Sequence, residues 1–89
     1  GKAIFLMRDM KLNVWKGDAA PQGAPVDLKK GCRGYVLSEP QRIPGSLILA
    51  LAEYNAAPVS LDQLLKKPSS YREVILNFAT FRANVYIDV

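Results

Sequence analysis

The sequence lacks histidine and contains a single cysteine, Cys32, among its 89 residues. Histidine is the usual general base and the commonest metal ligand, so Ser-His-Asp and Cys-His catalytic arrangements cannot be built. One thiol can form neither an intramolecular disulfide nor a Cys/His zinc site. We therefore expect no metal, no cofactor and no enzymatic activity, and we interpret Cys32 as a small, half-buried residue.

Long apolar runs are also missing. The longest, Leu47–Ala52, has six residues, whereas a membrane-spanning helix needs about 20. The length fits one compact domain, because domains usually run from about 50 to 250 residues. The chain starts at Gly1, just before an apolar segment, and stops in another, Tyr86–Val89. Such ends suit a domain excised or processed from a longer polypeptide, and equally a complete small protein.

The N-terminal half reads as short strands separated by turns. Alternation of apolar and polar residues over Met10–Val14 is typical of a half-buried strand, and the run before it is continuously apolar. Arg8-Asp9 interrupts the pattern, and we favour one long irregular strand over a hairpin because this dipeptide is not a turn former. The expected elements are a strand at Ala3–Trp15, a loop at Lys16–Pro25, a short strand at Val26–Leu28, a turn at Lys29–Gly34, and a strand at Tyr35–Leu37 that stops at Glu39-Pro40.

Two helices are expected in the middle of the chain. Leu47–Ala57 is rich in Leu and Ala, which favour helix, and Ser46 and Pro58 stand where a cap and a terminator belong. Such a helix would be apolar nearly all round and would have to be buried. A capping-box pattern, with Ser60 followed by Gln63, predicts a second helix at Leu61–Lys67.

Branched and aromatic residues dominate the C-terminal stretch and favour strands. We predict a strand at Arg72–Phe78, a hairpin turning near Ala79–Arg82, and a last strand at Val85–Val89. Another capping-box match at Ser70 leaves a helix over Tyr71–Phe81 as the alternative.

These elements predict an α+β domain with a small, mostly antiparallel sheet and one or two helices packed on one face. The alternative is an all-β sandwich, which becomes the better interpretation if Leu47–Tyr54 is extended. Substitution of a buried Leu51 by Ala should cost about 2–5 kcal/mol. The predicted core comprises Ile4, Leu6, Met10, Leu12, Val14, Val36, Leu37, Leu47, Leu51, Leu64, Val74, Leu76, Phe78, Val85 and Ile87.

One basic, glycine-containing turn has the composition of a binding site. Backbone N–H groups in such a turn can converge on an anion, and a neighbouring tyrosine can stack on a base. A plain solvated turn between strands has the same composition, and the spacing matches no P-loop. The net charge of +4 is spread along the chain. The candidate residues for contact with an anion or a nucleic acid are Lys29, Lys30, Arg33, Tyr35 and Arg42.

Trp15 and Tyr86 are the candidate contacts with a protein partner, since large aromatic residues are enriched at binding hot spots. Three functional hypotheses follow. The first is a non-enzymatic protein-interaction or assembly module that acts through an edge strand or an apolar patch and binds a protein partner or a second copy. The second is a nucleic-acid or polyanion binder that uses the basic turn. The third is a small enzyme that relies on Lys, Tyr or carboxylates.

Overall fold

A computed structural model describes residues 2–15 and 23–88. Its largest feature is a five-stranded sheet in the order β6-β5-β4-β1-β7, in which every neighbouring pair is antiparallel. A second, two-stranded sheet pairs β2 with β3. The elements are β1 (Ala3–Leu6), β2 (Met10–Leu12), β3 (Val26–Leu28), β4 (Arg33–Ser38), β5 (Ser46–Ala52), α1 (Leu61–Leu65), a 3₁₀ turn (Pro68–Ser70), β6 (Tyr71–Asn77), α2 (Phe78–Asn84) and β7 (Val85–Ile87). The predicted α+β class is confirmed.

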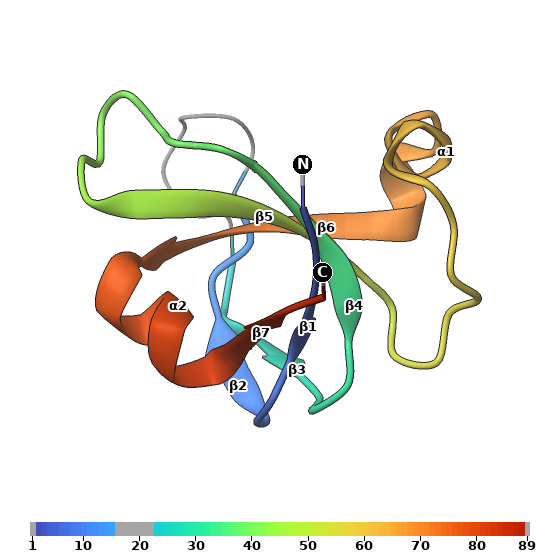
Figure 1. The fold of residues 1–89 in the computed structure, drawn as a ribbon, viewed down its shortest axis with the longest axis horizontal. Coiled ribbons are helices and arrows are strands. Elements are labelled where there is room, and N and C mark those ends of the chain that lie inside the picture. Colours follow the sequence, from blue (N-terminus) through green and yellow to red (C-terminus); the bar gives the residue numbers. More distant parts are fainter. Residues whose placement is uncertain (1, 16–22, 89) are drawn as a thin grey trace.

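The large sheet is strongly curled. In Figure 1, β5 and β6 run across the view, whereas β1 and β4 run up it. Helix α1 lies near one end of β6, and α2 joins the other end of β6 to β7 (Figure 1). Residues of β2 and β3 pack against the buried cluster of the large sheet, so the small sheet covers its inner face. Among the described residues, no helix is long and apolar enough to cross a membrane.

The predicted long strand at Ala3–Trp15 is broken. The chain bends between β1 and β2, and the two strands join different sheets without pairing with each other. The bend is held by the Asp9 carboxylate, which accepts a hydrogen bond from the Lys30 N–H at 2.7 Å, and by the Gly31 N–H, which donates to Leu6 O at 2.8 Å. The predicted strands at Val26–Leu28 and Tyr35–Leu37 are confirmed as β3 and β4. Most of the predicted Lys16–Pro25 loop lies outside the described residues.

The predicted helix at Leu47–Ala57 is wrong, because residues Ser46–Ala52 form β5. This strand pairs with β4 on one side and with β6 on the other. A strand with neighbours on both sides can bury residues on both faces, and Leu49, Ala50 and Leu51 are all buried. A continuous apolar run of this kind reads equally as a buried helix, which is why periodicity alone did not separate the two.

The predicted strand at Arg72–Phe78 is confirmed as β6, and the alternative helix at Tyr71–Phe81 is wrong. The predicted hairpin near Ala79–Arg82 is also wrong, because α2 occupies these residues and β7 pairs with β1. The Asn77 side chain accepts a hydrogen bond from the Thr80 N–H at 2.8 Å and so caps α2.

The predicted helix at Leu61–Lys67 is confirmed as α1, which ends at Leu65 with Lys66 as its C-cap. Its capping box is present. The Ser60 hydroxyl accepts a hydrogen bond from the Gln63 N–H at 3.3 Å, and the Ser60 N–H donates to Gln63 Oε1 at 3.4 Å. The sequence signal of this helix is therefore seen directly in the structure.

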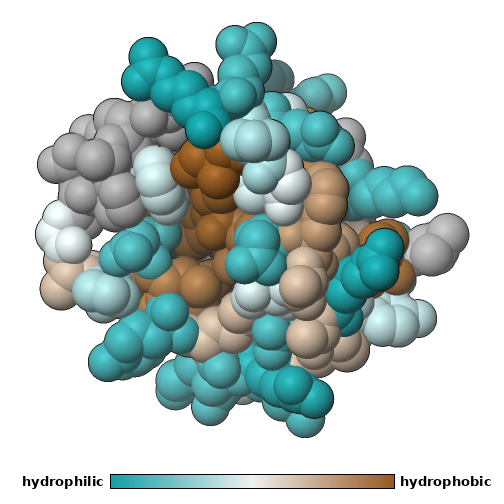
Figure 2. Space-filling view, turned by 90° about the vertical axis from the view of Figure 1, so that its left-hand side faces the viewer, coloured by the Kyte–Doolittle hydropathy of each residue, from teal (hydrophilic) through white to brown (hydrophobic). Residues whose placement is uncertain are grey.

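Most of the predicted core is buried or packed against the buried cluster. Val14 and Leu37 are only half-buried, and Phe78 is exposed at 41%, while Phe81, three residues on, is buried instead. The Phe78 N–H donates to Gly45 O, so this end of α2 lies against the loop between β4 and β5. Figure 2 shows that side of the molecule, where apolar residues are visible in a recess framed by hydrophilic ones. Cys32 is only 2% exposed and belongs to the core.

Candidate functional site

The large sheet has an outer face that the core does not occupy. Ile4 and Leu6 of β1 point into the core, so Ala3 and Phe5 point to the opposite side. The strand register places Tyr35 beside Ala3, and it places Arg33 and Tyr86 on either side of Phe5. We call this side of β7, β1, β4 and β5 the outer face.

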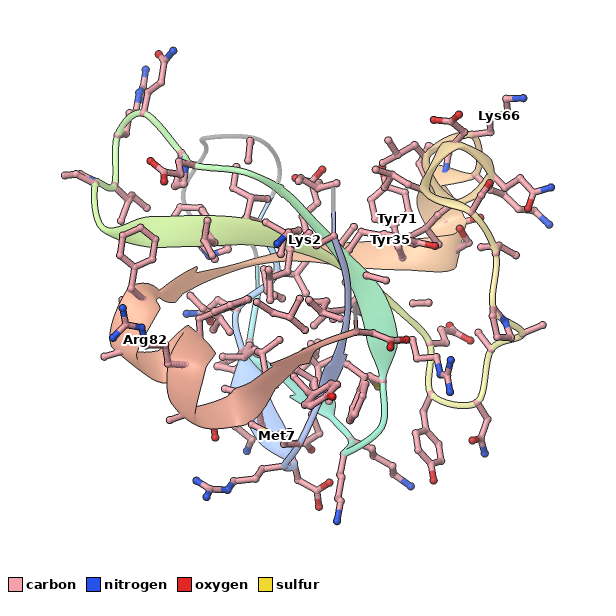
Figure 3. The ribbon with its side chains drawn as sticks, viewed as in Figure 1. Lys2, Met7, Tyr35, Lys66, Tyr71 and Arg82 are labelled. Carbon is pink, nitrogen blue, oxygen red and sulfur yellow. The ribbon has the colours of Figure 1, made fainter. Side chains whose placement is uncertain are left out.

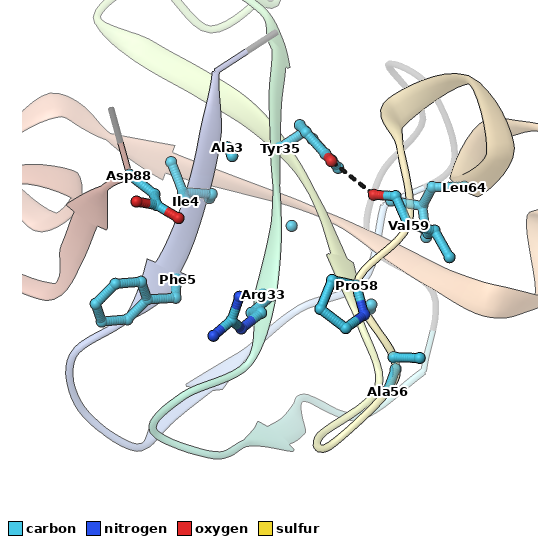
Figure 4. A pocket seen from close by; sticks show the side chains of 13 residues that line it. Ala3, Ile4, Phe5, Arg33, Tyr35, Ala56, Pro58, Val59, Leu64 and Asp88 are labelled. Atoms are coloured by element: carbon cyan, nitrogen blue, oxygen red, sulfur yellow. Dashed lines mark hydrogen bonds between the residues drawn. The ribbon is translucent and has the colours of Figure 1, made fainter.

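A hollow of about 180 Å³ lies on the outer face (Figure 4). On the sheet side its lining includes Ala3 and Ala52, whose small side chains leave space above the strands, and the backbone of Gly34. The larger side chains of Phe5 on β1 and Tyr35 on β4 also line the hollow. The opposite wall comes from the segment between β5 and α1, chiefly residues 56–59. We refer to this space as the hollow.

The far wall of the hollow is tied to the sheet. The Tyr35 hydroxyl donates a hydrogen bond to Val59 O at 2.6 Å, drawn as a dashed line in Figure 4. Leu64 of α1 is buried next to this wall and also lines the hollow. Internal contacts therefore hold both walls in place, and this reduces the ordering that binding requires.

An aromatic pair borders the hollow. The rings of Phe5 and Tyr86 lie 4.9 Å apart between centroids with an interplanar angle of 32°. Phe5 lines the hollow, and Tyr86 is 50% exposed on the edge strand β7. Tyr86, a candidate partner contact from the sequence, thus stands beside the hollow. Trp15 does not, because it is half-buried and its N–H donates to Glu73 O on β6, at the other edge of the sheet.

The backbone of the basic turn is occupied by internal hydrogen bonds. The N–H groups of Lys30, Gly31 and Cys32 donate to Asp9 Oδ1, Leu6 O and Lys29 O, respectively. Gly31 has a φ of 94°, a value that favours glycine at this point of the turn. These three N–H groups therefore serve the turn itself, and an anion there would have to be held by side chains.

The structure brings only some of the predicted anion-binding residues together. Arg33 and Tyr35 both line the hollow, and Lys29 and Lys30 are exposed in the turn that precedes Arg33. Arg42 is exposed in the loop at the far end of β4. The five residue steps from Arg33 to Ser38 span about 17 Å in a strand, which separates Arg42 from the turn.

Sequence reasoning missed most of the hollow. The run Ile4–Met7 is continuously apolar, a pattern typical of a strand buried on both faces, and this pattern hid the outward position of Phe5. The predicted helix Leu47–Ala57 and its terminator Pro58 cover most of the far wall, which residues 56–59 form. The outer face could have been predicted from period-two alternation, because Ala3 and Phe5 on one strand, and Arg33 and Tyr35 on the next, alternate with buried residues.

Comparison with known proteins finds no matching family model, no similar curated protein and no similar solved structure. Within residues 2–15 and 23–88, no three His, Cys, Asp or Glu side chains are grouped as metal ligands would be. The functional argument therefore depends on the geometry of the hollow and the groups around it.

Proposed function

We propose that this domain is a non-enzymatic protein-interaction module whose hollow receives an apolar side chain from an extended segment of a partner protein. The observation that carries this proposal is an apolar hollow with preformed walls on the exposed face of a sheet. Its volume of about 180 Å³ suits one large side chain. Small-molecule and cofactor sites are usually larger, at about 300–1,000 Å³.

The residues around the hollow have the composition of a binding hot spot. Aromatic residues and arginine dominate the centres of protein interfaces, where they fill or border small pockets. Phe5, Tyr35 and Arg33 line this hollow, and Tyr86 extends the aromatic surface toward β7. The Tyr35 hydroxyl is already engaged with a carbonyl oxygen, which supports a binding role for Tyr35 over a chemical one.

The exposed edge of β7 is a weaker candidate for the partner contact than the hollow is. Asp88 N–H donates to Ala3 O and Met7 N–H donates to Asn84 O, so alternate residues of this strand face β1. Val85 and Ile87 are then the residues of β7 whose backbone groups face away from β1. The Val85 N–H already donates to Phe81 O, so Ile87 is the residue of β7 that offers both of its backbone groups to an added strand. Short edge strands of this kind limit strand addition. We therefore assign the main contact to the hollow and not to the edge.

Nucleic-acid binding is the second candidate, and one observation favours it. The rings of Tyr86, Phe5 and Tyr35 stand on three adjacent strands of one sheet face, as in platforms on which bases stack. The occupied N–H groups of the basic turn and the distant Arg42 weaken this candidate. Asp88 also lines the hollow and would repel a phosphate backbone.

The proposal is tested by selecting random peptides displayed on phage against the purified domain and measuring their affinity by fluorescence anisotropy. Ala57→Trp should fill the hollow, because Ala57 is exposed and lines it. We expect this substitution to weaken peptide binding by about 2 kcal/mol or more. Ala83→Trp, on the exposed surface of α2, is the matched control and should bind as the parent does.

Thermal unfolding of both variants shows whether each retains the parent fold. The proposal fails if no peptide is enriched, or if enriched peptides bind the Ala57→Trp variant as well as the parent. A labelled oligothymidylate measured in the same way tests the second candidate, whose binding must weaken steeply as salt is added.

A further inference from the structure

The basic turn lies at one end of the hollow. Lys29 Nζ is 5.4 Å from the centre of the Tyr54 ring, and a Cβ atom at Gly31 would lie 3.7 Å from Tyr54 Cε1. Tyr54 begins the turn that leads from β5 into the wall at residues 56–59. The turn that carries Lys29 and Lys30 is therefore packed against the start of that wall, and Arg33 continues from it into the lining of the hollow. We call the surface formed by Lys29, Lys30 and Arg33 the basic end of the hollow.

The cations of the basic end face few carboxylates. Asp9 accepts the Lys30 N–H, and Glu53 is exposed next to Tyr54. Asp88, which directly follows β7, also lines the hollow. It is level with Ala3 and so displaced along the strands from Arg33, which is level with Phe5. The ion pair found in the described parts of the chain joins Lys11 to Asp27, in the small sheet. Arg33 is exposed beside the apolar walls of the hollow, and within residues 2–15 and 23–88 its guanidinium has no ion-pair partner.

We propose that the partner segment is acidic where it leaves the hollow at the basic end: its apolar side chain fills the hollow, and Asp or Glu side chains next to it bind Arg33 and Lys29. This inference rests on the proposed function, because it describes the ligand of the same hollow. A guanidinium beside an apolar wall is a strong partner for a carboxylate, with which it can form two parallel hydrogen bonds. The net charge of +4 also draws an acidic partner toward the domain.

A carboxylate-bearing peptide fits this surface better than a phosphate chain does. The backbone N–H groups that would hold a phosphate already donate within the turn. Asp88 stands at the other side of the hollow, so a uniformly anionic ligand would be repelled there, whereas a segment with acidic residues at one end would not. The arrangement therefore selects a ligand that is apolar in the middle and acidic at one end.

The test exchanges charges on both partners. The strongest selected peptide is resynthesised with its Asp and Glu residues replaced by Asn and Gln, and separately by Lys. The domain carries Lys29→Glu together with Arg33→Glu. The matched control carries Lys66→Glu with Arg82→Glu, which changes the net charge equally, at the C-cap of α1 and on α2 (Figure 3). Neither residue lines the hollow.

We expect the peptide with Asn and Gln (the amide peptide) to bind the unsubstituted parent domain about tenfold more weakly than the original acidic peptide does. This difference in affinity should shrink as salt is added. The Lys29→Glu/Arg33→Glu domain should prefer the lysine peptide, whereas the control should keep the parent's preference for the acidic one. The inference is overturned alone if peptides bind and depend on Ala57 but the amide peptide binds as well as the acidic one. It falls together with the proposed function if no peptide is selected, or if oligothymidylate displaces the peptides from the parent domain.

Discussion

Gly34 shows how tightly one residue can determine the architecture of the site. A Cβ atom at this position would overlap the carbonyl oxygen of Ala50 on the neighbouring strand, and it would also crowd the backbone of Leu51. Gly34 has an ordinary negative φ, so space and not backbone conformation demands glycine here. Gly34 therefore determines how closely β4, which lines the hollow, can approach β5.

Gly34→Ala should destabilise the domain by about 3 kcal/mol, because β4 and β5 must move apart to admit the methyl group. Gly45→Ala is the comparison, since its φ of 78° is strained for alanine but nothing lies within 4 Å of the added atom. That variant should lose only about 1 kcal/mol. Urea unfolding measures both, and equal losses would contradict the packing argument.

Leu51→Ala should cost about 2–5 kcal/mol, the value expected when a fully enclosed leucine is truncated. Leu51 is 1% exposed in the structure and packs in the core, although on a strand and not on the helix first expected there. Leu65→Ala is the control, because Leu65 is 39% exposed. A chemical denaturation midpoint for Leu51→Ala close to that of the control would show that Leu51 is not buried.

At the scale of elements, α1 and α2 begin with the same kind of cap but were not equally visible in the sequence. The Ser60–Gln63 box was recognised, since both of its residues match a known pattern. Asn77 caps α2, but the third residue of this helix is Thr80 and not the Glu or Gln of a capping box. The branched residues around Asn77 favoured a strand and a hairpin instead. To predict α2 from the sequence, the capping ability of Asn77 would have had to outweigh the strand preference of the branched and aromatic residues near it.

Asn77→Ala should destabilise the domain by about 1 kcal/mol, because the Thr80 N–H at the start of α2 loses its partner. Ser69→Ala, at an exposed position of the 3₁₀ turn, serves as the control and should change little. Guanidinium unfolding curves give both values. A loss no larger than that of Ser69→Ala would mean that Asn77 does not act as a cap.

The sequence was sufficient for local elements and for the fold class, but not for the pairing of distant strands. β3, β4, β6 and α1 follow from alternation, turn residues and a capping box close by in the chain. The identity of β5 depends on neighbours at both of its edges, and the position of β7 depends on pairing with β1 at the opposite end of the chain. Arg33 and Tyr35 were candidates from the start, whereas their neighbour Phe5 became one only through the register of β1 against β4.

At the scale of the whole molecule, the two faces of the curled sheet have different roles: the inner face holds the core, and the outer face holds the proposed binding surface. Its inner face, covered by the small sheet and by Phe81 of α2, carries the core. Its outer face carries the aromatic pair, Arg33 and the sheet side of the hollow on strands whose positions the core secures, while Lys29, Lys30 and the far wall lie in the adjoining connections. A binding surface held on a rigid sheet in this way changes little on association, so the affinity should depend on the side chains that line it.

The most direct test of this account is an NMR titration of the ¹⁵N-labelled domain with the strongest selected peptide, followed through backbone amide shifts. We predict that the perturbed amides gather at Phe5, Gly34, Tyr35 and Ala57, around the hollow, and at the adjoining basic end. The amides of Lys11 and Asp27 in the small sheet should stay unchanged. Perturbations centred on the small sheet or on α2, with the residues of the hollow unaffected, would contradict the account.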